Sequence, residues 1–193
     1  SDTPKELMLG DCLDRLKELP DNSVDAVVTD PPYGIDYQDV KKTHRKIQND
    51  NSNPTELISN ALKLSQCSTA YLCCNWKCMT EMADAMANAN LPPKSCIVWD
   101  KGSRVQNLDK FAKRHEFVLY AGKFGGERTV ADDVWQINRE VRKDHPTAKP
   151  VQLCQDAIKY TEAKSVYDMF GGSGSTLIAC EQLDRRCFAM EID

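Results

Sequence analysis

Residues 166–183 read VYDMFGGSGSTLIACEQL, and this stretch decides the fold. It opens with a short apolar run that predicts a buried strand over residues 166–169. Gly171, Gly172 and Gly174 then predict a tight turn, because glycine adopts backbone conformations that other residues avoid. Strand, glycine-rich turn and helix in succession are typical of an α/β protein whose backbone approaches a ligand closely. The helical spacing after the turn rests on Thr176, Ala179, Cys180 and Leu183.

The rest of the chain continues this alternation. Several further runs are continuously apolar, as expected for strands that helices cover on both faces. Seven strands alternating with helices predict an open, mostly parallel sheet, whose ligands bind beyond the carboxyl ends of the strands. The other six predicted strands are residues 6–9, 24–29, 70–74, 95–99, 117–121 and 187–192, and helical spacing appears at residues 13–19, 79–86 and 151–161.

Size and composition indicate one ordinary domain. The chain has 193 residues, of which 41% are hydrophobic and 28% charged. This balance excludes a disordered chain, a collagen-like repeat and a disulfide-stapled miniprotein. No apolar run approaches the roughly 20 residues that span a bilayer, and the N-terminus lacks the pattern of a signal peptide. We therefore expect one domain over residues 1–193, with no membrane partner and a cytoplasmic location.

The nine cysteines do not predict disulfides or a metal site. Their number is odd and no export signal is present, which favours free thiols in a reducing compartment. Cys73, Cys74 and Cys78 form the one sequence cluster, but no nearby Cys or His supplies a fourth zinc ligand. We therefore interpret them as small buried hydrophobic residues rather than metal ligands.

The sequence TDPPYG at residues 29–34 follows the predicted strand 24–29. Two prolines fix the backbone and remove two donors, so the Asp30 carboxylate and the carbonyls of Asp30 and Pro31 become neighbouring acceptors. Such acceptors match the two N–H bonds of a planar exocyclic amine, and the Tyr33 ring offers a surface for stacking a base. A plain Pro-Pro turn at a strand end explains the tetrapeptide equally well.

Two more segments predict parts of a ligand site. Glu191 comes about 20 residues after the glycine-rich turn, where a carboxylate can accept hydrogen bonds from ribose hydroxyls. No Gly-Lys-Ser/Thr follows that turn, which excludes a P-loop. The segment HPTAKP at residues 145–150 precedes a predicted helix, where Lys149 would hold a carboxylate. A solvated loop lysine is the simpler interpretation of Lys149 taken alone.

In this order, the segments resemble the β group of amino-directed DNA methyltransferases. Members transfer the methyl group of S-adenosylmethionine to the exocyclic amine of adenine or cytosine. They carry D-P-P-Y first, then a target-recognition segment, H-P-T-x-K-P and F-x-G-x-G, which residues 30–33, 145–150 and 170–174 match. Residues 10–13 and 115–117 also look like family segments, so the resemblance covers nearly the whole chain.

The resemblance implies a fold and a catalytic turn. The fold is the seven-stranded, Rossmann-like α/β methyltransferase sheet, mostly parallel and circularly permuted, with one antiparallel strand that we expect at residues 117–121. The catalytic turn consists of Asp30, Pro31, Pro32 and Tyr33. Asp30 and the Pro31 carbonyl would accept the hydrogens of the target amine, and Tyr33 would stack on the flipped base. Transfer would be direct, so catalysis would rest on positioning and electrostatics.

The resemblance also implies S-adenosylmethionine as cofactor. Asp168 would lie near its ammonium group, Lys149 near its carboxylate and Glu191 on its ribose, with Asp11 and Cys12 by the adenine. The full set of residues expected to bind the cofactor is Asp11, Cys12, Lys149, Asp168, Phe170, Gly171, Gly172, Ser173, Gly174 and Glu191. No metal is expected.

Double-stranded DNA is the expected partner, although the net charge of −4 would argue against nucleic acid if charge were spread evenly. Phosphate contacts need local positive charge, and basic runs flank the strand ends. A solvated loop is the simpler interpretation of any one run. Residues 35–53 would form a loop over the target, and residues 102–144 a short recognition region. The resemblance also allows a homodimer. The residues expected to bind DNA are Lys41, Lys42, Arg45, Lys46, Lys101 and Arg104.

Three alternatives to an adenine enzyme stay open. Asp at the head of the tetrapeptide is commoner in adenine methyltransferases, whereas Ser is commoner in those that methylate the cytosine amine. Enzymes that methylate a glutamine amide in proteins normally carry Asn there, so Asp30 and the segment HPTAKP count against that class. A non-catalytic DNA-binding relative would be expected to have lost Asp30 or the glycines, and this chain keeps both.

Overall fold

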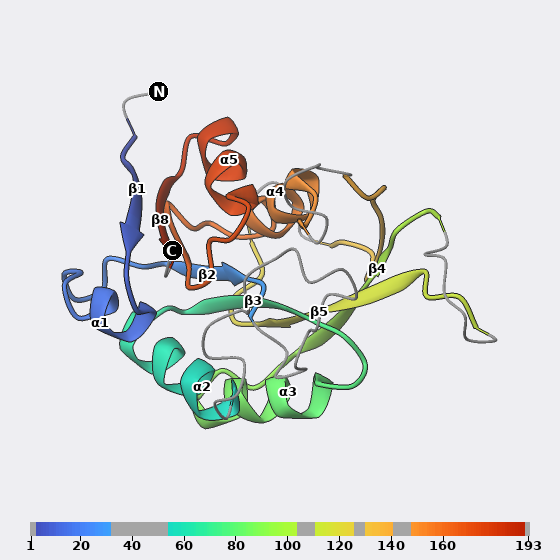
Figure 1. Ribbon diagram of the computed structural model, residues 1–193, viewed down its shortest axis with the longest axis horizontal. Helices are drawn as coiled ribbons and strands as arrows, with labels where there is room; N and C mark the ends of the chain where they lie inside the picture. Colours follow the sequence, from blue (N-terminus) through green and yellow to red (C-terminus); the bar gives the residue numbers. More distant parts are fainter. Residues whose placement is uncertain (1–2, 32–53, 104–110, 126–129, 141–147, 192–193) are drawn as a thin grey trace, which may run out of the picture.

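The computed structural model describes residues 3–31, 54–103, 111–125, 130–140 and 148–191. The strands in these residues form one eight-stranded sheet in the order β1-β8-β7-β2-β3-β5-β4-β6 (Figure 1). They are β1 (Lys5–Leu9), β2 (Ala26–Thr29), β3 (Thr69–Cys74), β4 (Ser95–Asp100), β5 (His115–Ala121), β6 (Val134–Gln136), β7 (Ser165–Asp168) and β8 (Arg186–Glu191).

The sheet is parallel apart from one strand. β5 runs antiparallel to both of its neighbours, β3 and β4, and every other pair is parallel. This confirms the mostly parallel sheet and the antiparallel strand predicted at residues 117–121. All seven predicted strands are present, but the count of seven is wrong by one. The extra strand is β6, whose three residues are too few to form a recognisable apolar run.

Helices cover both faces of the sheet (Figure 1). Strand β3 shows how side chains divide between the faces, because successive residues of a strand point in opposite directions. Leu72 and Cys74 pack in a core with Met82 of α3, whereas Tyr71 and Cys73 pack in a second core that includes residues of α4 and α5. The helices are α1 (Cys12–Leu16), α2 (Pro54–Ser65), α3 (Met79–Asn88), α4 (Val151–Lys159) and α5 (Ser175–Gln182).

Four of these helices occur where helical spacing predicts them. α1 ends at Leu16, earlier than the apolar spacing up to residue 19 suggests. No prediction covered α2, although buried Ile58, Ala61 and Leu62 recur in it at helical spacing. Within the described ranges, none of the helices combines the length and apolar character needed to cross a membrane.

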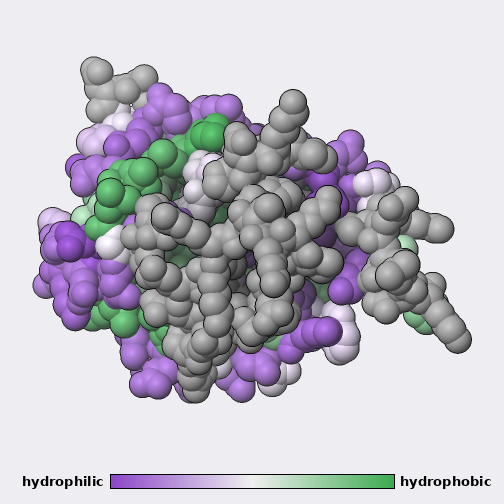
Figure 2. Space-filling model, in the orientation of Figure 1, coloured by the Kyte–Doolittle hydropathy of each residue, from purple (hydrophilic) through white to green (hydrophobic). Residues whose placement is uncertain are grey.

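The edge of the sheet at β1 leaves apolar side chains in contact with solvent. Figure 2 shows hydrophobic surface gathered over the strip where β1 and α5 lie in Figure 1. The exposed apolar residues of these two elements are Leu7, Leu9 and Ile178. Lys5, next to them on β1, forms an ion pair with Glu181 of α5 at 2.7 Å. The helix therefore covers β1 only in part.

Gly122 lies directly after β5, in a place where substitution is expected to cause a large loss of stability. Its φ of +116° is unfavourable for other residues, and a Cβ would lie 2.3 Å from the Ser68 carbonyl oxygen and 2.5 Å from the Thr69 Cα. We expect Gly122→Ala to lower the free energy of unfolding by about 3 kcal/mol, from backbone strain and overpacking together. Urea denaturation measures this change.

Gly125→Ala is the matched control. The three atoms nearest to a Cβ at Gly125 all belong to the Glu162 side chain, the first at 3.2 Å, and that side chain can move. We expect the free energy of unfolding of this variant to lie within about 1 kcal/mol of the wild-type value. Equal losses in the two variants would contradict the assigned role of the Gly122 conformation.

Candidate functional site

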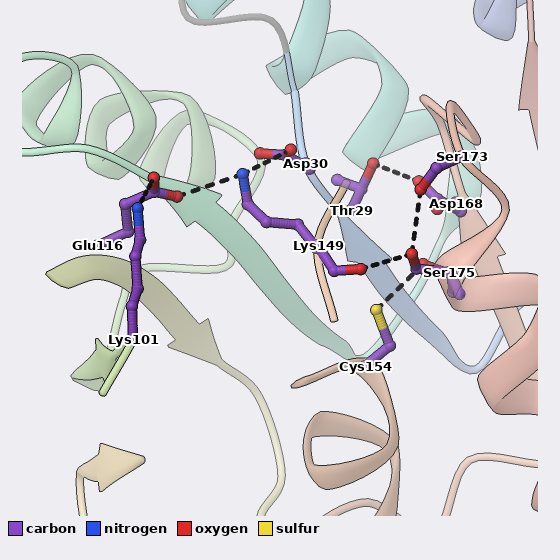
Figure 3. Close-up of polar contacts among 10 residues, drawn as sticks. Thr29, Asp30, Lys101, Glu116, Lys149, Cys154, Asp168, Ser173 and Ser175 are labelled. Atoms are coloured by element: carbon purple, nitrogen blue, oxygen red, sulfur yellow. Dashed lines mark hydrogen bonds and ion pairs between the residues drawn. The ribbon is translucent and has the colours of Figure 1, made fainter. Parts of the chain in front are cut away.

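One edge of the sheet collects the polar residues that follow its strands. The carboxyl ends of the parallel strands meet there, and antiparallel β5 contributes its start instead. Asp30 follows β2, Lys101 follows β4 and Glu116 lies at the start of β5. Lys149 arrives on the segment that leads into α4. The side chains of these four residues point toward one another in Figure 3.

The Asp30 carboxylate is bound to Lys149 and lies beside the end of β7. Its Oδ2 is 2.8 Å from Nζ of Lys149. The preceding residue, Thr29, donates a hydrogen bond of 2.7 Å from its hydroxyl to Oδ1 of Asp168. The structure therefore brings together a predicted catalytic residue and a predicted cofactor residue. Pro31 is buried, and Pro32 and Tyr33 lie outside the described residues.

Lys149 is held by two carboxylates of the protein itself. Its Nζ is 3.2 Å from Oε2 of Glu116 as well as 2.8 Å from Asp30. Burial lowers the pKa of Lys149, but the two carboxylates outweigh burial and raise the pKa well above its ordinary value, so the side chain stays protonated. The antiparallel course of β5 brings Glu116 to Lys149, while the contact of Lys149 with the cofactor carboxylate stays a prediction.

Glu116 connects Lys149 to a second lysine. Its Oε1 is 2.5 Å from Nζ of Lys101, and that ammonium group lies 5.1 Å from the centroid of the Trp99 ring. Burial raises the pKa of Glu116, but the two lysines more than offset it and hold the pKa below its ordinary value. Lys101 is also one of the residues predicted to contact DNA phosphates, and this contact stays a prediction. The Lys101 side chain is only 8% exposed and its ammonium group is paired inside the site.

The Asp168 carboxylate is buried at the end of β7. Burial raises its pKa from the ordinary 3.8 to about 7, although the hydroxyls of Thr29 and Thr176 act in the opposite direction. Its Oδ1 also accepts a hydrogen bond of 3.2 Å from the Phe170 N–H. A cationic ligand group would favour the ionised form of this carboxylate, because its charge would compensate for burial. Asp168 therefore suits the predicted contact with an ammonium group.

The glycine-rich turn folds against the end of β8. The Gly171 N–H donates to the Met190 carbonyl at 2.6 Å, and a Cβ at Gly171 would lie only 3.1 Å from that oxygen. The Gly172 N–H donates to the Glu191 carboxylate at 2.5 Å. Gly174 has a φ of +75° at the N-cap of α5, a left-handed conformation that favours glycine. The turn and Glu191 are thus brought together.

The other residues predicted near the cofactor also lie on this side of the edge. The Ser173 and Ser175 hydroxyls are 3.0 Å apart, and Phe170 packs on the core that contains Met82. The Asp11 carboxylate caps α1, where its Oδ1 accepts hydrogen bonds from the N–H groups of residues 13 and 14 at 2.9 and 3.4 Å. Cys12 is buried, and burial raises the pKa of its thiol to about 11. The structure gives Asp11 a capping role that the sequence did not predict.

The Gly10 N–H joins this group to β8. It donates to the Glu191 carbonyl at 2.8 Å, so the ends of β1 and β8 meet. Asp11 and Cys12 therefore start next to Glu191, so these three residues predicted to bind the cofactor lie close together. Most residues predicted to contact DNA lie outside the described residues. They are Lys41, Lys42, Arg45, Lys46 and Arg104, and the loop at residues 35–53 also lies outside.

The clustered cysteines are buried, as predicted. All nine cysteines are described and none forms a disulfide. Burial raises the pKa of Cys73, Cys74 and Cys78, so their thiols are kept protonated. Among the residues that the structure describes, no group of three or more His, Cys, Asp and Glu side chains has the arrangement of a metal site.

Two residues at this edge had no role in the predictions. Glu116 belongs to a segment that resembles the family. The rule that ligands bind after parallel strands does not point to it, because Glu116 lies at the start of an antiparallel strand. Trp76 follows β3 and its side chain is 68% exposed. The sequence feature that points to Trp76 is an aromatic residue just after a predicted strand, with Asn75 and Lys77 on either side. Lys77 lies with Nζ 5.9 Å from the centroid of the Trp76 ring.

Known proteins share both the sequence pattern and the fold. Residues 24–193 match the DNA methylase family N6_N4_Mtase. YubD of Escherichia coli (strain K12), whose name describes it as a methylase, is 28% identical over 192 residues that cover 95% of this chain and 82% of YubD.

Solved structures of methyltransferases have the same fold. The M1.HpyAVI complex with S-adenosylmethionine superposes with a TM-score of 0.74 at 22% identity, covering 98% of this chain and 94% of that one. The cytosine-N4-specific PvuII DNA methyltransferase gives a TM-score of 0.74 at 15% identity, covering 99% and 83%. The family match spans most of the chain, including the turn at Asp30 and the glycine-rich turn. This protein is therefore a member of the N6_N4_Mtase family of DNA methylases.

Proposed function

We propose that this protein transfers the methyl group of S-adenosylmethionine to the exocyclic amino group of adenine in double-stranded DNA. The observation that carries the proposal is the hydrogen bond between Thr29 and Asp168. It holds Asp30, which would receive the target amine, next to the glycine-rich turn, which would receive the cofactor. Two ligands bound on either side of this bond would meet at one point of the sheet edge.

The residues around the glycine-rich turn fit the cofactor. The buried Asp168 carboxylate, with a pKa of about 7, would pair with the ammonium group of the cofactor. The Glu191 carboxylate would exchange its bond with the Gly172 N–H for bonds with ribose hydroxyls. A Cβ at Gly171 would lie 3.1 Å from the Met190 carbonyl oxygen, so a side chain there would require the end of β8 to shift. When bound, S-adenosylmethionine supplies an electrophilic methyl group.

The catalytic turn would orient the acceptor. In this proposal the Asp30 carboxylate and the Pro31 carbonyl accept the two N–H bonds of the target amine, so that the nitrogen lone pair faces the methyl group. Tyr33 stacks on the flipped base. Direct transfer to nitrogen suits the thiols near Asp30, because Cys73, Cys74 and Cys78 have raised pKa values, the opposite of an activated nucleophile.

Adenine is preferred to cytosine because Asp stands at the head of the D-P-P-Y turn. The match to a cytosine-N4-specific structure concerns the fold alone. We place target recognition in residues 102–144, of which residues 104–110, 126–129 and 141–144 lie outside the described ranges.

Radiolabelled S-adenosylmethionine tests the proposal. The protein is incubated with unmethylated genomic DNA or with a protein extract, and the DNA is then hydrolysed and its nucleosides separated. Label in N6-methyladenine supports the proposal, and label in N4-methylcytosine replaces adenine with cytosine as the target. Label in protein alone, or no label in any DNA, refutes it.

Trp76 and Lys77 are proposed to contact DNA beside the target. Exposed aromatic rings stack on unpaired bases, and lysine pairs with phosphate. We expect Trp76→Ala to raise the dissociation constant for sonicated unmethylated DNA about tenfold, since a stacked base contributes about 1–3 kcal/mol. Filter binding at one fixed salt concentration measures the constant.

Phe124→Ala is the control for this variant. Phe124 is also a partly exposed aromatic residue, but it follows β5 and therefore lies at the opposite edge of the sheet. We expect Phe124→Ala to leave the dissociation constant for DNA within about twofold of the wild-type value, because a surface substitution away from the interface has a small effect. If the two variants bind DNA equally well, Trp76 does not belong to the interface.

A further inference from the structure

Four side chains of alternating charge form a chain across the site. Lys101 contacts Glu116 at 2.5 Å, Glu116 contacts Lys149 at 3.2 Å, and Lys149 contacts Asp30 at 2.8 Å. Lys101 follows β4, Glu116 lies in β5, Lys149 precedes α4 and Asp30 follows β2. Figure 3 shows their charged groups in one row. The chain ends on the carboxylate that the proposed function makes catalytic.

Lys149 is the residue on which this chain depends. Its side chain is 12% exposed, so its ammonium group is largely removed from water. An ammonium group in such a place costs several kcal/mol unless carboxylates compensate. Among the described residues, Asp30, Glu116 and the Cys73 thiol are the groups whose charge acts most strongly on it. Asp30 and Glu116 thus share one buried cation and hold it from two sides.

Glu116 is itself fixed from the opposite side of Lys149. Its second oxygen is taken by Lys101, whose ammonium group rests on the Trp99 ring. Trp99 donates a hydrogen bond of 2.8 Å from its indole N–H to the Ile137 carbonyl. These partners belong to or adjoin paired strands, which move little. Glu116 is therefore fixed relative to the sheet, and its carboxylate fixes the Lys149 ammonium group in turn.

The backbone of Lys149 is bound on the cofactor side. The Ser175 hydroxyl donates a hydrogen bond of 2.6 Å to the Lys149 carbonyl. Ser175 is the first residue of α5 and directly follows the glycine-rich turn. Lys149 therefore spans the site, with its main chain tied to the turn and its ammonium group on Asp30. A shift of Lys149 would change the distance between the proposed methyl donor and acceptor.

We propose that Glu116 is a positioning residue for methyl transfer, which acts by holding the Lys149 ammonium group against the Asp30 carboxylate. This inference rests on the proposed function. Glu116 touches neither the target base nor the cofactor. It limits the orientations of Asp30, so that the acceptor nitrogen meets the methyl group in line, where small misplacements are costly.

Glu116→Gln tests the proposal because it keeps the shape and removes the charge. With cofactor and DNA both saturating, we expect the single-turnover rate constant to fall about 10- to 100-fold, in line with the cost of misplaced reacting groups. The dissociation constants for S-adenosylmethionine and DNA should stay within about twofold, because Glu116 contacts neither ligand. Glu116→Asp keeps the carboxylate and should recover part of the rate; it also serves as the test if Glu116→Gln fails to fold.

Glu181→Gln is the matched control. It also removes one carboxylate from a lysine, since Glu181 pairs with Lys5 at 2.7 Å, but that pair lies at the end of α5 away from the site. This variant should react at the wild-type rate. A wild-type rate in Glu116→Gln, or an equal loss in both variants, would overturn the positioning role.

The titration of Lys149 separates this inference from the proposed function. NMR of the lysine ammonium groups, assigned with a Lys149→Arg variant, measures it without any methyl transfer. Loss of one of two nearby carboxylates should lower the pKa of Lys149 by about one unit or more in Glu116→Gln. An unchanged titration overturns the inference. If the wild type methylates no DNA while the titration shifts, the proposed function fails but the charge arrangement stands.

Discussion

Replacement of Asp30 by alanine is expected to lower the rate constant for methyl transfer about 1000-fold. The variant removes the acceptor for the target amine, and losses of this size are typical when a preorganised electrostatic contact to the reacting group disappears. Lys149 would lose one of the two carboxylates that pair with it in the described residues and keep Glu116. Single-turnover transfer from labelled S-adenosylmethionine measures the rate constant, and isothermal titration calorimetry measures cofactor affinity, which should change less than about threefold.

Asp30→Asn is the informative companion. Its amide oxygen can still accept one hydrogen bond from the amine, whereas its charge is lost and its ion pair with Lys149 is broken. We expect a loss of about 10- to 100-fold, smaller than in alanine, because one acceptor remains. Full activity in Asp30→Ala would contradict the proposed mechanism. A loss of cofactor binding as large as the loss of rate would move Asp30 to the cofactor site.

Cofactor affinity is expected to rise with pH below about 7, because the pKa of Asp168 lies at about 7. In the proposed cofactor site, Asp168 releases its proton to pair with the ammonium group of the cofactor. The dissociation constant should therefore fall up to about tenfold per pH unit between pH 5.5 and 7. The ammonium group itself stays charged in this range, since α-amino groups titrate near 8. Calorimetry with S-adenosylhomocysteine avoids turnover. Asp168→Asn should bind weakly and without this pH dependence, whereas an equal dependence in both proteins would contradict the assignment.

Stability is expected to change in the opposite direction with pH. The pKa of Asp168 is about 7 in the folded chain and about 3.8 in the unfolded chain, so between these values the folded state binds the extra proton. The stabilising contribution is fully present below pH 4 and is lost as pH rises through 7, with a total of about 4 kcal/mol. Urea denaturation of the wild type and Asp168→Asn at pH 5 and pH 8 measures it. At each pH, the free energy of unfolding of the wild type is subtracted from that of Asp168→Asn. This difference should be larger at pH 8 than at pH 5. An identical difference at the two pH values would show that Asp168 titrates normally.

The fold could be predicted where a local pattern was strong. Continuous apolar runs located seven strands, and glycines at 171, 172 and 174 located the turn before α5. β6 was missed because it has three residues and forms only by pairing with β4. α2 carries a helical pattern in Ile58, Ala61 and Leu62, although no prediction covered it.

The sequence alone determined that three of the predicted site residues meet at one edge of the sheet. Asp30, Asp168 and Glu191 each follow or end a parallel strand, and parallel strands must bring their carboxyl ends to one edge. Only the tertiary structure decided how charges pair there. Glu116 reaches the edge because β5 runs antiparallel between β3 and β4, and it then binds Lys101 and Lys149. Spacing along the chain predicts ligand contacts for both lysines but does not reveal a carboxylate that arrives from a distant strand. Ion pairs depend on distances through space, and those are fixed by the order and direction of the strands.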